Sequence, residues 1–516
     1  MRNSLWLALL LVSVSCTAPT LSVPNLEYLR CPTASMPVGT PDTGAGGGDT
    51  SIFGSSTKTN PNNCINDQSI CKELGMNFTC DTKQGCCTEN VQGKCNQISD
   101  CTDTTLMDNK HEICNLPTNN CGPCSTADQT MGNAQCAAWA PTQVNGAGRV
   151  ICLTGTCVEC KTTPDCTKNP LKPVCDSFDN TCKGCLKHTD CASQVCKLDS
   201  SLLQATDTID NLGECVKTAD VALVDNTVMC DPTGPLAGKP FCQVSQALGA
   251  TNPKVFPYIR VAGSPTVYGP IMISTAKRVA IVGPAMGRDL PAAQQSVING
   301  VVISGAATVT LSEVAVGETT GAPAAIQCSG SSTLNFQKSF IGKYGVQPNA
   351  GIIATGCTVD MEKSKIYAAQ GYGLSITNGS GHRVVNNVII RNGLNGLLNQ
   401  PSGMRLNGAP GLFSFNTIAG NMQGVQCDTQ VAITNSIVIS NPMENVSATC
   451  QTSATVITAG VTLNPNYSTM GEDPTLTAGQ SLCIDLASKD PTVKDDYLGK
   501  ARPQGAGYDI GFQEIQ

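Results

Sequence analysis

Acidic side chains are few in the middle of this 516-residue chain, where only six occur between positions 301 and 445. They are Glu313, Glu318, Asp360, Glu362, Asp428 and Glu444. Asp360 and Glu362 are two residues apart, so in a strand they would share one face. Paired carboxylates roughly 6.5 to 9.5 Å apart can hydrolyse a glycoside, whereas eliminative cleavage needs stacked carboxylates for calcium and an Arg or Lys base. No neighbouring repeat supplies a third acid at this register, so the pair is a weak catalytic candidate.

Arg383 is the cation that the repeat register brings to this pair. Asp360 lies four residues before Ser364, and Arg383 lies four residues before Asn387. Because Ser364 and Asn387 occupy equivalent positions in successive repeats, Asp360 and Arg383 should be adjacent. An exposed ion pair there would contribute about 0 to 1 kcal/mol.

His382 stands in a glycine-containing segment, Ser380-Gly381-His382-Arg383. The segment resembles the histidine and basic residues of polygalacturonase-like enzymes, but the second glycine and the aspartate motifs of that family are missing. His382 and Arg383 are therefore weak catalytic candidates, and a lone histidine in such a turn is more often a surface residue. An anionic glycan could instead contact three scattered cations, which are usually just solvated: Lys343, Arg391 and Arg405.

These residues must be positioned by a repeat in which a small polar residue is followed two positions later by isoleucine. It occurs as Ser339/Ile341, Ser364/Ile366, Asn387/Ile389, Asn416/Ile418 and Asn435/Ile437. The pairs recur about every 20 to 30 residues, a period that indicates stacked coils. We expect the isoleucines to form an inward ladder with a rise of about 4.7 to 4.9 Å, and the Ser/Asn ladder to lie at a turn and bond the backbone locally. A β-sandwich is the alternative, but it should show strict alternation and hairpin turns.

Residues 258 to 283 resemble the first coils of right-handed parallel β-helix proteins of the pectate-lyase-like class. The matching segments are Tyr258 to Val261, Val267 to Tyr268, Ile271 to Ser274 and Val279 to Gly283. Residues 221 to 248 resemble the entry segment of surface β-helix proteins, which implies a Cys230–Cys242 bridge and a short capping helix. The fold class predicted is all-β, a right-handed parallel β-helix preceded by small disulfide-rich repeat modules.

The segment from Asp495 to Glu514 resembles the closing motif of bacterial surface β-helix proteins, D-x-x-G-x-x-R followed by D-I-G-x-x-E. The matching residues are Asp496, Gly499, Arg502, Asp509, Ile510, Gly511 and Glu514. We interpret Arg502 and Asp509 as a structural cap pair, because an open end of stacked strands needs covering.

Cysteine is the most unusual component: 24 of the 30 cysteines lie between Cys31 and Cys242. Cys157/Cys160/Cys166 recurs as Cys182/Cys185/Cys191, which indicates small modules held by disulfides in an oxidising compartment. The C-x-x-C pairs also allow a zinc site or, less readily, a redox site. The spacing resembles cysteine-rich repeats of secreted and surface lipoproteins of myxobacteria-like bacteria. Which of five later cysteines is unpaired stays open: Cys328, Cys357, Cys427, Cys450 or Cys483.

The N-terminus, up to Cys16, has the pattern of an export signal, with Arg2 before the apolar run Leu5 to Val12. Ser13 to Cys16 resembles a lipobox, which implies lipidation of Cys16. The Pro-, Gly-, Ser- and Thr-rich stretch that follows has the composition of a tether. Ordinary cleavage, with Cys16 in a disulfide, is the alternative.

A net charge of -7 and the absence of basic runs argue against nucleic acid as a partner. We predict a signal peptide at 1–15, a tether at 16–63, cysteine repeats at 64–217, a β-helix with its N-terminal cap at 218–490 and a closing motif at 491–516. No cofactor or metal is expected, and calcium is unsupported. The expected protein is an outer-membrane or cell-surface lipoprotein, alternatively secreted, that binds extracellular polysaccharide or cell-surface components or is structural. A polysaccharide lyase or glycoside hydrolase is the alternative.

Overall fold

The protein is described from a computed structural model. The described residues are 78–81, 86–89, 113–115, 120–142, 148–166, 169, 171–231, 239–249, 257–274, 277–284, 295–317, 321–342, 347–394, 402–457 and 483–514. The predicted signal, Cys16 and the tether lie outside them. Within this part of the chain no helix is long and apolar enough to cross a membrane. The chain forms two compact units, Met1–Lys161 and Thr162–Gln516.

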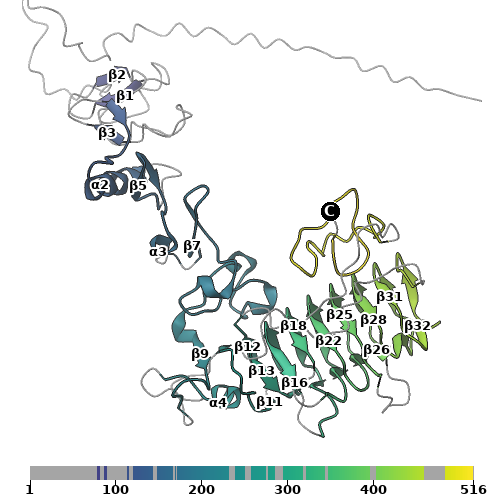
Figure 1. The fold of residues 1–516 in the computed structure, drawn as a ribbon. Coiled ribbons are helices and arrows are strands. Elements are labelled where there is room, and N and C mark those ends of the chain that lie inside the picture. Colours follow the sequence, from purple (N-terminus) through teal and green to yellow (C-terminus); the bar gives the residue numbers. More distant parts are fainter. Residues whose placement is uncertain are drawn as a thin grey trace, which may run out of the picture. The chain divides into compact units, whose positions relative to one another are not determined.

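The first unit contains short antiparallel strand pairs and one helix (Figure 1). Its described elements are β1 (Phe78–Asp81), β2 (Cys86–Glu89), β3 (Ile113–Asn115), β4 (Asn120–Gly122), α2 (Gln129–Trp139), the 3-10 turn Ala140–Thr142, β5 (Ile151–Leu153) and β6 (Thr156–Val158). Asp128 caps α2 by accepting hydrogen bonds from the backbone N–H groups of Thr130 and Met131. Trp139 packs among the disulfide-bonded cysteines, which supply much of this small core.

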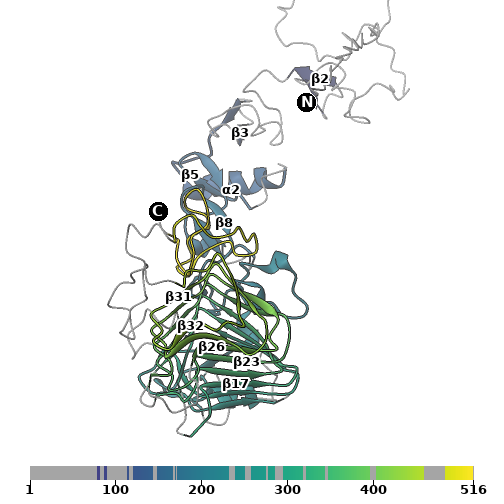
Figure 2. The ribbon, with the colours of Figure 1, turned by 90° about the vertical axis from the view of Figure 1, so that its right-hand side faces the viewer.

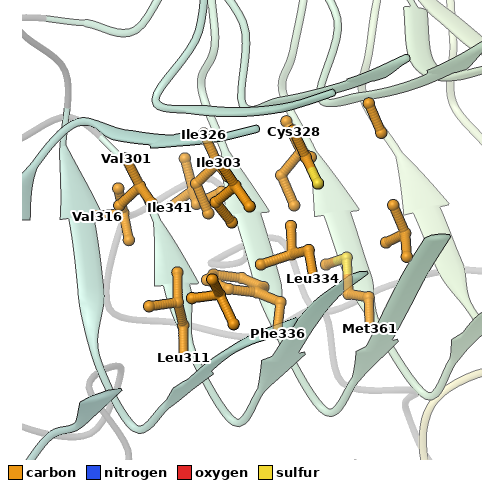
Figure 3. Close-up of a cluster of buried hydrophobic side chains, with 14 of the residues drawn as sticks. Val301, Ile303, Leu311, Val316, Ile326, Cys328, Leu334, Phe336, Ile341 and Met361 are labelled. Atoms are coloured by element: carbon orange, nitrogen blue, oxygen red, sulfur yellow. The ribbon is translucent and has the colours of Figure 1, made fainter. Parts of the chain in front are cut away.

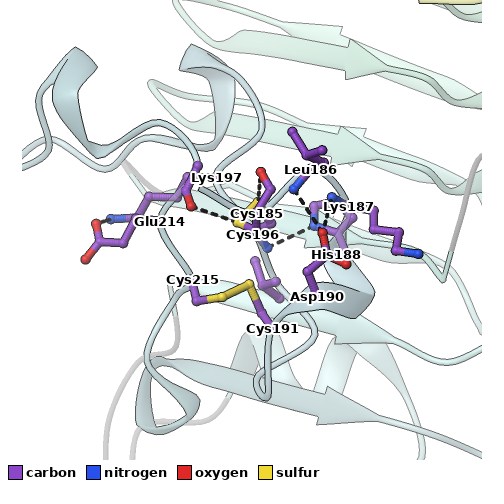
Figure 4. Close-up of a disulfide and its surroundings, with 12 residues drawn as sticks. Cys185, Leu186, Lys187, His188, Asp190, Cys191, Cys196, Lys197, Glu214 and Cys215 are labelled. Carbon is purple, nitrogen blue, oxygen red and sulfur yellow. Dashed lines mark hydrogen bonds and ion pairs between the residues drawn. A yellow bond between two sulfur atoms is a disulfide. The ribbon is translucent and has the colours of Figure 1, made fainter. Parts of the chain in front are cut away.

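The second unit begins with another cysteine-rich module. Its elements are α3 (Thr163–Cys166), β7 (Val174–Asp176), β8 (Thr181–Lys183) and the 3-10 turns His188–Asp190, Ser200–Leu202, Ile209–Asn211 and Thr218–Asp220. Figure 4 shows Cys191 bonded to Cys215, with Cys185 and Cys196 beside them.

The disulfides show how the cysteines of the C-x-x-C pair Cys182/Cys185 are used. Cys182 bonds Cys166, whereas Cys185 bonds Cys196, so the two members of this pair have different partners. Within the described chain, every group of three side chains close enough to hold a metal consists of disulfide-bonded cysteines. The cysteines of the described C-x-x-C pairs are therefore used in disulfides, and the density of disulfides is characteristic of an exported protein.

The rest of the second unit is a parallel β-helix of three sheets, as predicted from the repeat (Figures 1 and 2). The ten-stranded sheet contains, in spatial order, β33 (Gln451–Ser453), β30 (Ala432–Thr434), β27 (Gly411–Ser414), β24 (His382–Val385), β21 (Thr358–Glu362), β18 (Thr333–Gln337), β15 (Thr308–Ser312), β12 (Arg278–Val282), β10 (Tyr258–Val261) and β9 (Val221–Val224). The eight-stranded sheet contains β11 (Ile271–Ile273), β14 (Val301–Ile303), β17 (Ile326–Ser329), β20 (Ile352–Thr355), β23 (Leu374–Thr377), β26 (Ser402–Asn407), β29 (Gln423–Cys427) and β32 (Glu444–Val446). The seven-stranded sheet contains β13 (Val297–Asn299), β16 (Ala315–Gly317), β19 (Phe340–Ile341), β22 (Lys365–Tyr367), β25 (Val388–Ile390), β28 (Thr417–Ala419) and β31 (Ile437–Ile439).

The core of the β-helix is a stack of aliphatic side chains contributed by all three sheets (Figure 3). Ile341 pairs with Ile366, Ile366 with Ile389, and Ile389 with Ile418, so four members of the predicted ladder are confirmed. The fifth is wrong, because Ile418 pairs with Val438 and Ile437 pairs with Thr417. Ile437 is buried on the other side of its strand, in a second cluster with Phe512.

The polar ladder also departs from the prediction at its fifth member, Asn435, and its hydrogen bonds differ from those expected. The backbone N–H of Ser364 donates to Asn387 Oδ1 at 2.9 Å, and that of Asn387 donates to Asn416 Oδ1 at 3.0 Å. The backbone N–H of Asn416 donates to Ser436 Oγ rather than to Asn435. The ladder therefore ties successive coils together from inside, in addition to local bonds such as Ser364 Oγ to the Glu362 carbonyl. Asn435 instead has a positive φ of 48°, a conformation that Asn tolerates.

A second asparagine ladder, which was not predicted, lines the next corner of the coil. The backbone N–H groups of Ala369, Asn392 and Asn421 donate to the side-chain oxygens of Asn392, Asn421 and Asn441 respectively. Asn392 and Asn421 are fully buried. They lie five residues after Asn387 and Asn416 of the first ladder, a spacing that was available in the sequence.

The N-terminal end is closed as the resemblance implied. Cys230 and Cys242 form a disulfide, and the short helix α4 (Val244–Gly249) buries Val244 in the β-helix core. The cysteine-rich module also contacts the β-helix, because Leu202 and Val216 pack with side chains of β10 and β12. Residues 162–217 therefore belong to the same compact unit as the β-helix.

The C-terminal segment lies against the seven-stranded sheet, near β25, β28 and β31 (Figure 1). Its buried ion pair joins Arg502 Nη1 to Glu514 Oε1 at 2.6 Å, and Arg502 also bonds Asp509, its predicted cap partner. The backbone carbonyl of Asp509 accepts a hydrogen bond from Arg502 Nη1, and the Asp509 carboxylate accepts one from the Asp485 backbone N–H. Of the five later cysteines, all of which are described, Cys483 is the unpaired one, since Cys328–Cys357 and Cys427–Cys450 are disulfides.

Candidate functional site

Asp360, Glu362 and Arg383 meet on the outer face of the ten-stranded sheet. Asp360 and Glu362 alternate with the buried residues Val359 and Met361 on β21, so both acids point outward. Arg383 on β24 is the register partner of Asp360. Arg383 Nη1 lies 3.3 Å from Asp360 Oδ1 and 2.5 Å from Glu362 Oε2. The ion pair expected from the repeat register is therefore present, and it includes Glu362 as well.

Arg383 is the fixed charge of the cluster, and burial acts on the acid beside it. Burial, partly opposed by Arg383, raises the pKa of Asp360. Burial would lower the pKa of Arg383, but Glu362 and Asp360 outweigh it and raise that pKa. Arg383 is therefore a fixed cation, because a guanidinium does not deprotonate in proteins. One cation between two carboxylates leaves the cluster with a net formal charge of -1.

Uncharged polar side chains extend the same face towards the preceding coils. Gln337 Nε2 donates to Asp360 Oδ1 at 3.3 Å, and Asn335 Nδ2 donates to Thr310 Oγ1 at 3.1 Å. Thr310, Asn335, Asp360 and Arg383 occupy one register across four strands. Asn335 and Gln337 were not predicted as members of this face, although each precedes an acid of the pair by the interval of one repeat.

The two ends of this face are covered. At one end Thr310 Oγ1 donates to the Ser201 carbonyl of the cysteine-rich module at 2.7 Å. At the other end Lys363 pairs with Asp495 of the C-terminal segment, and Val385 packs with Val493 and Tyr508. Between these covers, the side chains of Asp360, Glu362 and Arg383 remain 32%, 21% and 27% exposed.

His382 is not part of the cluster and is not the surface residue expected. It is 2% exposed. Its Nδ1 accepts from the Val359 backbone N–H at 3.2 Å, and its Nε2 lies 3.2 Å from the Asn378 carbonyl. Burial lowers its pKa, so the neutral ring with a proton on Nε2 satisfies both contacts. His382 joins adjacent coils, and the cluster has no histidine base.

The remaining charged candidates are dispersed. Asp428 pairs with Arg405 at 2.7 Å on the eight-stranded sheet, and Glu444 accepts from Gln423 there. Glu313 is buried where the cysteine-rich module contacts the β-helix, near His188. Arg391 belongs to the loop after β25 and has other interactions. Lys343 and Glu318 lie outside the described residues.

This arrangement suits hydrogen bonding to a hydroxyl-rich surface better than bond cleavage. The partly exposed carboxylates and guanidinium offer acceptors and donors on adjacent strands, whereas Asn335 and Gln337 are buried beside them. Inverting hydrolysis needs one protonated acid and one separate carboxylate with room for water, whereas both acids here bind the same guanidinium. Among the described residues, no group of three carboxylates is close enough to hold calcium.

Comparisons with known proteins show no family for this chain. No protein-family model matches the chain, and no curated protein matches it. Among solved structures, the crystal structure of pectate lyase Pel9A is similar, with 13% sequence identity and a TM-score of 0.30. The match covers 57% of this chain and 96% of that one. The class defined here, a disulfide-rich protein with a parallel β-helix, rests on the strand pairing and the disulfides of the chain itself.

Proposed function

We propose that the protein is an exported lipoprotein of a bacterial cell surface whose β-helix binds an extracellular glycan without cleaving it. The observation that carries the proposal is the cluster of Asp360, Glu362 and Arg383. Arg383 pairs with both carboxylates, while the exposed parts of the three side chains can still form hydrogen bonds with a ligand.

The surface location draws on the N-terminal sequence and the disulfides. Lipidation of Cys16 would anchor the protein, and the stretch 16–63 would act as its tether. Replacing Cys16 with Ser should move the protein from the membrane fraction to the soluble fraction. An unchanged distribution would remove the anchor from the proposal and leave a secreted binding protein.

The electrostatics of the cluster favour a neutral or weakly charged glycan. Asp360 and Glu362 outnumber Arg383, so a densely anionic chain would meet a local excess of negative charge. Binding by hydrogen bonds should depend only weakly on salt, whereas ionic binding is screened as ionic strength rises.

The test is retention of the purified protein on immobilised neutral and acidic polysaccharides, with and without calcium. Arg383→Gln should weaken retention, because it removes the donor and leaves two carboxylates side by side. Arg405→Gln is the matched control, since Arg405 also pairs with an acid but lies on a different sheet. Equal loss in both variants would exclude this face as the binding surface. New reducing ends or unsaturated products that vanish in Arg383→Gln would replace binding with a hydrolase or lyase activity.

A further inference from the structure

A cavity of about 600 Å³ lies within the second unit, between the 3-10 turns of the cysteine-rich module and the first coil of the β-helix. We propose that this cavity is a second binding site, one that takes a single neutral sugar residue or a similar polyol. It lies apart from the Asp360 cluster, and the proposal does not depend on the function suggested for that face.

The size and the walls of the cavity suit a small ligand. Ligand sites generally have volumes of about 300 to 1,000 Å³ and combine apolar walls with a few fixed polar groups. Val216, Pro257 and Tyr258 supply apolar surface here, and Tyr258 is held by a hydrogen bond from its hydroxyl to the Leu202 carbonyl at 2.7 Å. Such a surface can pack against the C–H face of a sugar ring.

The polar side is a network built around Lys197, which is only 7% exposed. Its Nζ lies 3.0 Å from Asp207 Oδ1 and 2.8 Å from Glu214 Oε2 (Figure 4 shows Lys197 and Glu214). Asn211 Nδ2 also donates to Glu214 Oε2, at 3.1 Å. These contacts fix the orientation of both carboxylates before any ligand arrives, which lowers the entropy cost of binding.

The network keeps unused hydrogen-bonding capacity. An ionised carboxylate has about four acceptor positions and an ammonium group has three donors. Within the described chain, Glu214 Oε1 accepts no hydrogen bond, and Lys197 Nζ bonds only to the two carboxylates. An acceptor and a donor beside each other match the hydroxyl groups of a sugar, each of which donates one hydrogen bond and accepts others.

The charges of the lining disfavour an anionic ligand. Lys197 and Lys217 oppose Asp207, Glu214 and Asp220, so two positive charges and three negative charges leave a formal net charge of -1. An acidic sugar would have to place its carboxylate near these acids. An amine would have to compete with Lys197, whose ammonium already pairs with both Asp207 and Glu214.

The cavity can be filled without touching this network. Ala205 and Thr206 line it and are exposed, so Ala205→Trp or Thr206→Trp should occupy its volume while leaving the disulfides intact. Asp210→Trp is the matched control, because Asp210 is exposed in the same module but does not line the cavity. Circular dichroism and disulfide mapping would show that all three variants fold.

Binding would be measured on the full chain by ligand-observed NMR and calorimetry, with neutral monosaccharides and disaccharides, a uronic acid and an amino sugar as probes. We expect at least one neutral saccharide to bind, about tenfold or more weaker binding in both cavity variants, and unchanged affinity in Asp210→Trp. Absence of binding by every neutral saccharide would overturn the proposal, as would equal affinity in folded Ala205→Trp and Thr206→Trp. Preference for the uronic acid or the amine would overturn the assigned ligand class. A loss of binding in Arg383→Gln alone would assign the sugar to the outer face instead.

Discussion

The cysteine-rich modules and the β-helix are both built from short repeats with few aromatic residues, yet they are stabilised by different means. In the modules, strands of three or four residues pair locally, and disulfides such as Cys136–Cys157 and Cys191–Cys215 form much of the interior. In the β-helix, each strand pairs with neighbours one coil away, and aliphatic side chains and buried amides stack along the whole length. Covalent links thus replace a core where a repeat is too small to have one.

Reduction of the disulfides is the strongest way to test this contrast. Bridges such as Cys136–Cys157 and Cys191–Cys215 lie between Cys124 and Cys215, and loss of each should cost about 2 to 4 kcal/mol. Under native conditions with a reducing agent, residues 120–217 should lose amide protection in hydrogen exchange, while β15 to β29 should keep theirs. A Cys328→Ala/Cys357→Ala variant controls for the bridges inside the β-helix. Equal loss of protection in both regions would show that the coils also depend on disulfides.

The buried amides offer the complementary test inside the β-helix. Asn416 Oδ1 accepts from the backbone N–H and from Nδ2 of Asn387, and Asn416 Nδ2 donates to the Val384 carbonyl at 2.7 Å. Asn416→Ala removes these bonds and leaves buried partners unsatisfied, which should cost about 2 to 4 kcal/mol. Native-state hydrogen exchange of β25 and β28 would measure the loss.

Thr452→Ala in the exposed strand β33 is the control, with an expected change within about 0.5 kcal/mol. If the two variants were equally stable, the ladders would be a by-product of stacking rather than one of its causes.

The repeat predicted the architecture well because its signal is periodic. Four isoleucines and the Asp360–Arg383 contact have the register inferred from spacing alone. The error at Asn435/Ile437 arose because Ile437 is apolar for another reason: the C-terminal segment covers the outer face of its strand. A sequence pattern cannot tell an apolar residue that faces the core from one that faces a cover.

The candidate site was less predictable because its members belong together only in three dimensions. Glu362 was placed on the correct face, but its contact with Arg383 was not expected, because the strand register pairs Arg383 with Asp360 and Glu362 with Val385. Arg502 and its partner Glu514 are separated along the chain, and spacing did not distinguish Glu514 from Asp509. The cavity around Lys197 left no sequence signal at all, since it combines irregular turns with the first coil.

The contact between the two kinds of repeat offers a smaller but sharper test, through pH. His188 of the module is 1% exposed, and its Nδ1 accepts from the Cys196 N–H at 3.0 Å. Burial first, then Arg260 and Lys338, lower its pKa to about 3. Glu313 of the β-helix lies 3.9 Å from its Nε2, and burial raises the pKa of this acid.

His188 and Glu313 have opposite effects on the free energy of unfolding as the pH falls. The pKa of His188 in the folded protein is below its ordinary value of 6.5. The stability that the neutral, buried ring contributes is therefore fully present above pH 6.5 and is lost as the pH falls towards 3. At pH 5 the loss should be about 2 kcal/mol. Glu313, whose pKa is raised, contributes more as pH falls and partly offsets that loss.

His188→Asn separates these contributions, since its side-chain oxygen can replace Nδ1 as the acceptor for Cys196. Between pH 6.5 and 5, module protection in hydrogen exchange should fall in the native protein and fall less in His188→Asn, while Glu313→Gln should steepen the fall. Identical pH profiles for the native protein and His188→Asn would mean that His188 does not titrate on opening. Loss of β-helix protection over the same range would mean that the modules and the coils do not open separately.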